Sequence, residues 1–565
     1  MNRTTRWIVF GVALAACVAV GYGAYTLAGI SWDRVVSYQS PYASLDVPAA
    51  TAASAEASRT VLVIIDGLRA DASRKMGTLN ALREHGTDLV AIAPQPSLSY
   101  PNWTTILSGA PPYVSGVVTN WHEGAAPVET LFDTADRAGV KTVFVGPEDF
   151  DALYGVKAKT AATFMRTWQK EYLTDVYVDA ALDLVDSQDP GLVVIHLPDV
   201  DEAGHSYGGA STQYAETVAK TDVDLGRLVQ GLQDGNTVFV VVSDHGHIDT
   251  GGHGGWEPEA VRVPVVIAGP KAKLGSGEAF VRSEGIAPTV AMLAGVAVPR
   301  NAIGEPFVDD VFRVSPSEAR ARALRARQVA SSALVSVAAS ATFDAGASMA
   351  TMTDDEITLA VTQAQQDRLA RDRTDRIVVG IAALGACIVV LAVVGLASWR
   401  ALVAAGAGAL AYYALYNLLF FAVHGYRWSL SAFNSEDLIE AWMNGRLVEA
   451  AVSLLFAALV AAIVYPLLRT APKPPRGDYL PGWLTLGPTT ALVVLATLGI
   501  QVAWFVWWWG IDPVWRLPQL MWAFKYDLDL IQATAVGFSA VASPLVVYLV
   551  GRYHPKVRRH TTAEE

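Results

Sequence analysis

Two β-branched runs that each end at a carboxylate constrain the fold of this chain more than any other feature. The first, VLVIID, ends at Asp66, and the second, TVFVVVSD, ends at Asp244. An apolar strand that stops at an acid delivers that acid to the carboxyl edge of a parallel sheet, where α/β proteins place their chemistry. The sequence therefore predicts a mostly parallel sheet with polar side chains gathered along one edge.

Further short β-branched runs lie along the same part of the chain, namely KTVFVG, LVVIHLPD and VPVVIAG. Stretches of helical character separate the runs, at residues 73–85, 128–138, 172–187 and 214–233. Strands that alternate with helices are typical of an α/β fold, in which a mostly parallel central sheet carries helices on both faces. We therefore expect one such domain in this part of the chain.

Long apolar stretches that are largely free of charge lie outside this region. Residues 7–29 form the first, and five more follow at residues 377–398, 401–423, 447–467, 484–509 and 530–551. An apolar stretch of about 20 residues is long enough to cross a bilayer. The whole chain is 52% apolar with a mean hydropathy of +0.31, above the range of an ordinary soluble enzyme. We expect six membrane spans, with a cleaved signal peptide as the alternative for residues 1–29.

The charges that flank these stretches predict their orientation. The head MNRTTR carries Arg3 and Arg6 and no acid, so the positive-inside rule keeps it in the cytoplasm. The later segments on the same side are also basic, namely the turn at Arg400, LLRTAPKPPRGDY and GRYHPKVRRH. We therefore expect an integral membrane protein with both termini in the cytoplasm and the α/β domain outside it. The net charge of −12 and the lack of a broad basic face argue against nucleic acid as a partner.

These boundaries divide the chain into six expected parts. They are an N-terminal transmembrane anchor at 1–29, a linker at 30–57, the α/β domain at 58–312, a helical connector at 313–375, a five-helix membrane region at 376–552 and a cytoplasmic tail at 553–565. An anchor alone needs only one span, so the extra spans favour a lipid as substrate or acceptor.

Acid and histidine residues in the α/β domain have the spacing of metal ligands. Asp201 and His205 lie four residues apart in DEAGH, so one helical turn can aim both at one ion. Asp244 and His245 are neighbours at a strand end, and His253 lies in the glycine-rich loop DTGGHGG, which can bend a ligand inward. One such pair alone is as readily a helix cap or a solvated turn. Both pairs together, each after an apolar strand, favour a metal site.

The cysteines limit which ligands such a site can use. Only Cys17 and Cys387 occur, and both lie in expected spans, so the α/β domain has no disulfide and no thiolate ligand. Its metals must be held by Asp, His and hydroxyl oxygen. Zinc takes Asp and His in tetrahedral sites, and manganese occupies similar ligand sets. We expect two divalent ions, with zinc as the first choice.

Ser99, in QPSLSYPNWTTILSG, is the candidate nucleophile. Its hydroxyl would be activated by metal rather than by a histidine base. The same serine could instead begin a turn or cap the helix that follows. Four other hydroxyl residues compete with it on the sequence alone: Ser97, Thr104, Thr105 and Ser108.

Four ordered motifs resemble those of the alkaline phosphatase superfamily, and most closely its type I phosphodiesterase and nucleotide pyrophosphatase branch. They are GLRADASRKMGTLNALREHG, PSLSYPNWTTILSG, LPDVDEAGHSYG and VVSDHGHIDTGGHGG, within residues 60–310. The resemblance implies the superfamily fold and two zinc ions that clamp the oxygens of an in-line displacement at phosphorus. Sulfatases are cousins with a Cys/Ser-x-Pro-x-Arg signal, but here Trp103 stands in place of the arginine. A formylglycine sulfatase is therefore not expected.

The resemblance also implies roles for individual residues. Asp201, His205 and His253 would bind one zinc, while Asp66, Ser99, Asp244 and His245 would bind the other. Ser99 stands before the aromatic-Pro-Asn triplet that follows the family nucleophile, which is usually threonine. Asn120, in SGVVTN, fits the asparagine that helps to hold the phosphoryl oxygens.

Five further side chains flank these motifs: Trp103, Trp121, His122, His247 and Glu257. Each could shape the leaving-group pocket, although aromatic residues near a loop more often serve packing. His247 follows the metal pair closely and is the one expected to face the substrate. None of the five is assigned a catalytic role.

The order of one leading span, an outer phosphodiesterase-like domain and a trailing multispan region is similar to that of the ethanolamine phosphate transferases of glycolipid-anchor synthesis. This chain carries fewer trailing spans than those proteins. The first expectation is a membrane-anchored, metal-dependent phosphodiesterase or phosphatase of the outer membrane face that works through a phospho-serine intermediate. The alternative is a phosphoethanolamine-type lipid phosphotransferase with a glycolipid acceptor, and a non-enzymatic membrane scaffold is the third.

Overall fold

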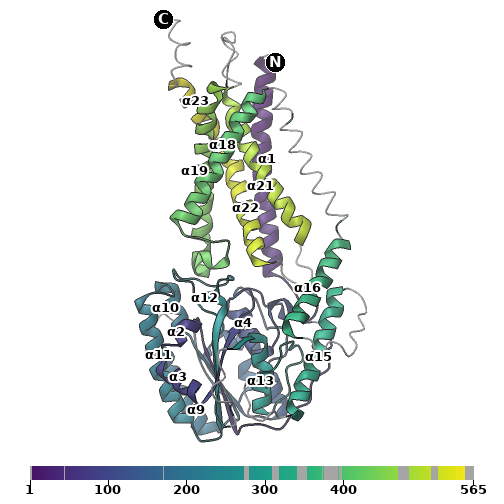
Figure 1. Cartoon of the computed structure of the whole chain (residues 1–565), viewed down its shortest axis with the longest axis vertical. Helices are drawn as coiled ribbons and strands as arrows, with labels where there is room; N and C mark the ends of the chain where they lie inside the picture. Colours follow the sequence, from purple (N-terminus) through teal and green to yellow (C-terminus); the bar gives the residue numbers. More distant parts are fainter. Residues whose placement is uncertain are drawn as a thin grey trace.

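The computed structural model describes most of the chain. The described residues are 3–43, 45–168, 171–270, 272, 279–307, 317–339, 353–371, 373, 392, 398–468, 483–510 and 519–553. They form an α/β domain and a bundle of long apolar helices that stands on one end of it (Figure 1).

The centre of the α/β domain is an eight-stranded sheet in the order β4-β3-β5-β1-β6-β7-β2-β8. Its strands are β1 (Arg59–Ile65), β2 (Gly86–Ile92), β3 (Thr142–Pro147), β4 (Ala162–Arg166), β5 (Leu192–Leu197), β6 (Thr237–Val242), β7 (Arg262–Ala268) and β8 (Ala279–Arg282). All neighbouring pairs are parallel except the two that involve β7, which runs antiparallel to β6 and β2. The expected mostly parallel α/β sheet is confirmed.

Helices cover both faces of the sheet, as expected, because each face carries its own apolar core. One core contains side chains from α3 (Gly77–Glu84), α9 (Thr174–Gln188) and α11 (Thr212–Leu232). The other contains side chains from α4 (Ser99–Ser108), α6 (Leu131–Ala138) and α13 (Ile286–Ala294). The central strands are buried on both sides, which explains why they read as unbroken apolar runs.

Some elements differ from the expectation. The helix expected at 73–85 is divided into α2 (Ala70–Ser73) and α3, and the guanidinium of Arg83 donates to the carbonyl of Ser73 across the break. The strands β2, β4 and β8 were not among the expected runs. The strands β4 and β8 are edge strands of partly exposed residues, so they lack a strong apolar signal.

The long apolar helices are α1 (Arg3–Val36), α18 (Trp399–Asn417) with its π-helical extension η3 (Leu418–Val423), α19 (Ile439–Leu467), α21 (Leu486–Trp509), α22 (Leu520–Ser539) and α23 (Ser543–Tyr553). Within the described residues, four helices are long and apolar enough to cross a membrane, or five if the bent pair α22 and α23 counts as one span. These helices support an integral membrane protein. The span expected at 377–398 lies almost wholly outside the described residues, so six spans and their orientation stay predictions.

Two features connect the bundle to the α/β domain. The first helix continues to Val36, into the expected linker, and Trp32 near its end contacts Trp121 with ring centroids 5.1 Å apart. The segment between η3 and α19, residues 424–438, contains the short helices η4 (Leu430–Phe433) and η5 (Glu436–Leu438). We call it the membrane loop. It contacts the edge of the sheet where β1, β5 and β6 end, so the site described below faces the bundle.

Candidate metal centre

Strand pairing brings the first group of expected ligands together. The strands β1 and β6 are parallel neighbours with Ile64 opposite Val242, so the acids that follow them emerge side by side. Three residues, Asp66, Asp244 and His245, each offer one ligand atom, and these atoms lie within 4.8 Å of one another. His245 Nε2 is 3.3 Å from Asp66 Oδ1 and 3.5 Å from Asp244 Oδ2. These three residues can hold one ion.

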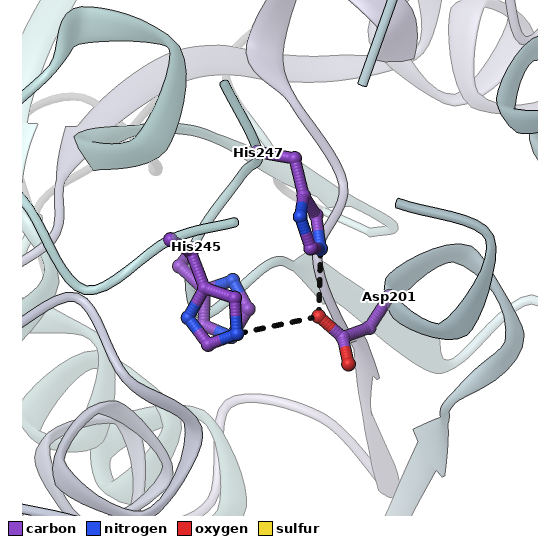
Figure 2. Close-up of side chains that lie close together, drawn as sticks. Asp201, His245 and His247 are labelled. Carbon is purple, nitrogen blue, oxygen red and sulfur yellow. Dashed lines mark hydrogen bonds and ion pairs between the residues drawn. The ribbon is translucent and has the colours of Figure 1, made fainter. Parts of the chain in front are cut away.

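A second group lies next to the first. It consists of Asp201, His245, His247 and His253, each of which offers one ligand atom, and these atoms also lie within 4.8 Å of one another. Figure 2 shows Asp201 pointing toward His247 and His245. His205 is the third ligand that the resemblance implies for this ion. Its Nε2 lies 3.4 Å from Asp201 Oδ2 and 3.1 Å from His253 Nε2.

The structure therefore brings all the expected Asp and His ligands into one cluster. Asp201 and His205 come from α10 (Asp199–Tyr207), which begins two residues after β5 ends. Their spacing of four residues places both on one face of that helix. His253 comes from the loop after β6, and its ring is stacked on that of His245 with centroids 3.7 Å apart. The loop glycines at positions 251, 252 and 254 all have positive φ, which lets the chain turn back toward the sheet.

The electrostatics of the cluster fit divalent cations. The carboxylates of Asp66, Asp201 and Asp244 are all buried. Burial raises the pKa of Asp66 well above its ordinary value, and the charges of Asp244 and Asp201 raise it further. Asp66 Oδ1 and Asp244 Oδ2 are buried without a hydrogen-bond partner. Buried acids that face one another with free oxygens are stabilised when a cation lies between them, and a donor set of carboxylates and imidazoles suits zinc.

Two histidines that the sequence did not assign as ligands support the acids. His196 Nε2 lies 2.9 Å from Asp66 Oδ2, and His247 Nε2 lies 2.7 Å from Asp201 Oδ1. Such partners orient ligand side chains and tune their affinity for metal. His196 lies inside the buried strand β5, opposite Ile64 of β1. A histidine within an otherwise apolar run was the signal that could have identified it.

The expectation that His247 faces the substrate is wrong. Its side chain is fully buried, and its ring packs directly over Gly204 of α10. A Cβ at position 204 would lie 2.5 Å from His247 Nε2, too close for any side chain without a shift of the ring. Gly204 therefore makes room for the ring that holds Asp201.

Ser99 is the hydroxyl residue at the metal cluster. It is the first residue of α4, and its Oγ lies 3.2 Å from His245 Nε2. The competing hydroxyls of Ser97, Thr104, Thr105 and Ser108 each donate to a backbone carbonyl. The N-terminus of a helix stabilises nearby negative charge, as an ionised or phosphorylated serine would require.

Asn120 lies next to Ser99, although its amide is engaged. Its Oδ1 accepts a hydrogen bond from the backbone N–H of Tyr100 at 3.0 Å, and its Nδ2 donates to the carboxylate of Glu436 in the membrane loop. One N–H of the amide group is left for a phosphoryl oxygen. The link to Glu436 joins residues 316 positions apart in the sequence.

Two spaces open from the cluster. A polar pocket of about 540 Å³ contains Ser99 and Asn120. Besides the expected ligand Asp201, its lining combines four acids with four aromatic residues: Asp149, Glu202, Glu436, Asp437, Tyr100, Trp103, Trp121 and Trp168. The second space is a narrow, mostly apolar crevice of about 90 Å³ that also reaches His253. Its walls include Trp32 and Val35 of α1 and Leu520, Ala523 and Phe524 of α22.

The polar pocket and the apolar crevice adjoin, because five residues border both: Trp121, His253, Asn434, Ser435 and Glu436. The cluster therefore lies between a space suited to a polar group and a space that leads to the membrane helices. Trp103 and Trp121 both line the polar pocket, whereas Glu257 is buried under the membrane loop.

Sequence comparisons relate this chain to phosphoester enzymes. The sequence is 26% identical over 319 residues to GPI ethanolamine phosphate transferase 1 of Aspergillus fumigatus, covering 45% of this chain and 31% of that protein. It is 25% identical over 326 residues to GPI ethanolamine phosphate transferase 1 of Homo sapiens, covering 48% of this chain and 35% of that protein. The chain thus spans about a third of the length of these relatives.

Among solved structures, murine ectonucleotide pyrophosphatase/phosphodiesterase 5 matches with a TM-score of 0.38 at 14% identity, over 42% of this chain and 96% of that chain. The family model described as type I phosphodiesterase/nucleotide pyrophosphatase matches residues 60–257. These residues include every Asp and His of the cluster together with Ser99 and Asn120. The resemblance read from the motifs is therefore confirmed, because the model of the type I phosphodiesterase/nucleotide pyrophosphatase family matches these residues.

Proposed function

We propose that this chain is a membrane-bound phosphotransferase that moves a phosphoethanolamine-type group from a lipid donor to a lipid-linked glycan through phospho-Ser99. The observation that carries the proposal is the position of Ser99. Its hydroxyl lies at the Asp and His cluster, where the polar pocket meets an apolar crevice bordered by α1 and α22. We propose that the α/β domain lies outside the cytoplasm, at the surface from which α1 and α22 enter the membrane.

In this proposal the cluster holds two zinc ions. Asp66, Asp244 and His245 would hold one, with Ser99 beside it. Asp201, His205 and His253 would hold the other. When bound, the ions would lower the pKa of the serine hydroxyl and neutralise charge on the phosphoryl oxygens. His196 and His247 keep the carboxylates of Asp66 and Asp201 in position for this task.

The reaction proceeds in two displacements at phosphorus. First, Ser99 Oγ forms a bond to phosphorus, and the bond from phosphorus to the donor's glycerol oxygen breaks. The serine proton is lost, and the donor leaves as diacylglycerol after its oxygen gains a proton. In the second displacement a hydroxyl of the acceptor attacks phosphorus and loses its proton, the bond to Ser99 Oγ breaks, and Ser99 Oγ regains a proton. Asn120 would donate to a phosphoryl oxygen in both steps.

The surroundings of Ser99 support a lipid with a cationic headgroup. Acids and aromatic rings line the polar pocket, and both attract an ammonium group, the acids by charge and the rings by cation–π interaction. The apolar crevice suits the glycerol and upper acyl segments of the donor. The relatives named GPI ethanolamine phosphate transferase agree with this substrate class. They favour the transferase over the hydrolase that was the first expectation from the sequence.

Hydrolysis is the second candidate, because the polar pocket is open enough to admit water to phosphorus and the family model is that of phosphodiesterases. Water would then replace the acceptor hydroxyl in the second displacement. The first displacement at Ser99 is common to both candidates.

The test uses the full chain in vesicles that contain phosphatidylethanolamine labelled in its headgroup, with and without a lipid-linked mannoside acceptor. Transfer predicts an acceptor that is heavier by one phosphoethanolamine unit, detected by mass spectrometry. Release of free phosphoethanolamine at an equal rate with and without acceptor would instead establish hydrolysis. Ser99→Ala should abolish turnover while zinc stays bound. Ser108→Ala is the matched control, because its hydroxyl lies on the same helix but donates to the Thr104 carbonyl.

A further inference from the structure

We propose that the membrane loop is part of the metal centre, and that Asn434 is a positioning residue that fixes His205 for metal binding. The inference rests on the metal centre of the proposed function but not on the identity of its substrate. It assigns a role in the phosphoester site to a residue, Asn434, that lies 177 residues beyond the end of the family match at residue 257.

Two hydrogen bonds hold the His205 residue against Asn434. Asn434 Nδ2 donates to the His205 carbonyl at 2.9 Å, and Asn434 Oδ1 lies 3.3 Å from His205 Nδ1. The first bond fixes which end of the amide faces the ring, because only Nδ2 can donate. The oxygen must then accept from a proton on Nδ1. In the neutral ring this leaves the lone pair on His205 Nε2, the nitrogen that faces Asp201 and His253. A bond to the second ring nitrogen is how proteins select the tautomer of a metal-binding histidine.

The backbone at Asn434 is strained. Its φ of 66° and ψ of −66° are those of a rare γ-turn, and the Ser435 N–H donates to the Phe433 carbonyl across it at 2.8 Å. In the described residues Asn434 and Asp189 are the two non-glycine residues with positive φ. Such conformations cost about 1–3 kcal/mol and persist where the surroundings enforce them, often at functional sites. Here the turn aims the Asn434 amide at His205.

The glycine-rich loop that carries His253 fits the membrane loop closely. A Cβ at position 251 would lie 2.9 Å from Asn434 Oδ1, and one at position 252 would lie 2.8 Å from Asn434 Cα. A Cβ at position 254 would lie 3.3 Å from the Cβ of Leu430. The glycines of GGHGG therefore do more than turn the chain, because they leave the space in which the membrane loop lies.

Buried polar contacts anchor the same loop. Ser429 and Ser431 both donate to Glu257 Oε2 at 3.0 Å, and the Gly255 N–H donates to Ser431 Oγ at 3.2 Å. The indole N–H of Trp256 donates to the Trp428 carbonyl at 3.1 Å. The partners in the α/β domain lie within four residues of His253 in the sequence. Those in the membrane loop lie within six residues of Asn434. The loop is thus held in register with the metal ligands.

The test measures zinc affinity of the purified full chain by competition with a chromogenic chelator. Asn434→Gly removes the amide but tolerates the γ-turn, so the loop keeps its path. We expect its zinc affinity to fall about 10–100-fold at one of the two sites, the usual effect of losing a partner of a metal-binding histidine. Asn434→Asp, which retains the oxygen that accepts from Nδ1, should recover most of that loss. Ser435→Ala is the matched control on the neighbouring residue.

Zinc affinity of Asn434→Gly equal to that of the wild type would overturn the inference, as would equal losses in Asn434→Gly and Asn434→Asp. A wild-type chain that binds no zinc would instead refute the metal centre of the proposed function, so the two failures are distinguishable.

Discussion

Replacing Gly204 by alanine should weaken the metal site, although glycine has no side chain that could bind a metal or a ligand. Gly204 lies within α10, where alanine is ordinarily preferred over glycine by about 1 kcal/mol. The new Cβ would lie 2.5 Å from His247 Nε2, so the ring must move by about 1 Å to reach an ordinary contact distance of 3.4 Å. The buried ring has no free space on this side.

A shift of this size would break the hydrogen bond from His247 to Asp201, which is 2.7 Å long. Loss of such a partner lowers metal affinity about 10–100-fold, which corresponds to about 1.4–2.7 kcal/mol. Overpacking of the buried ring would cost about 1–3 kcal/mol in folding stability and outweigh the gain in helix propensity. The two readouts are zinc affinity by chelator competition and the thermal unfolding midpoint in detergent.

Gly406→Ala is the matched control, because Gly406 also lies within a helix, α18, and a Cβ there would meet nothing within 4 Å. It should leave zinc affinity unchanged and not lower the midpoint. Zinc binding by Gly204→Ala as tight as that of the wild type, together with unfolding no earlier than the control, would contradict this role of Gly204.

Two further predictions concern the ions and the membrane loop. Dialysis against a chelator should abolish turnover and lower the unfolding midpoint. Zinc at about 100 times its Kd should then restore about 2.7 kcal/mol of the free energy of unfolding per site. An unchanged midpoint and full activity after metal loss would contradict the metal centre. Glu257→Leu should lower the midpoint more than Glu257→Gln, because leucine leaves the hydroxyls of Ser429 and Ser431 without their acceptor at a cost of about 1–3 kcal/mol each, whereas glutamine keeps an acceptor oxygen. Equal midpoints for the two variants, measured in the same detergent, would remove Glu257 as the anchor of the loop.

The parts of the site that the sequence predicted are those with a local pattern. Asp66 and Asp244 each close a β-branched run, so their place at the carboxyl edge follows from strand geometry alone. Asp201 and His205 are recognisable by their spacing along one helix. The five expected runs all form strands, because burial on both faces makes them continuous apolar runs.

The contributions of His247 and Asn434 could not be predicted in the same way. The role of His247 depends on the ring lying over Gly204, a contact between segments 43 residues apart in the sequence. Asn434 reaches His205 across 229 residues and from a loop between two apolar helices, where no local pattern marks it. The boundary between α2 and α3 was missed for a related reason, because no side chain caps α3 and the break depends on Arg83.

The close fit between GGHGG and the membrane loop has a consequence for how this protein can diverge. A side chain gained at position 252 would meet the backbone of Ser431 and Asn434, and one gained at position 254 would meet Leu98 and Leu430. Because backbone atoms occupy the space at position 252, no substitution in the membrane loop makes room there, and aligned relatives that keep this loop should keep glycine at that position. The helix bundle therefore cannot be exchanged for an unrelated membrane anchor unless the glycine-rich loop that carries His253 changes as well.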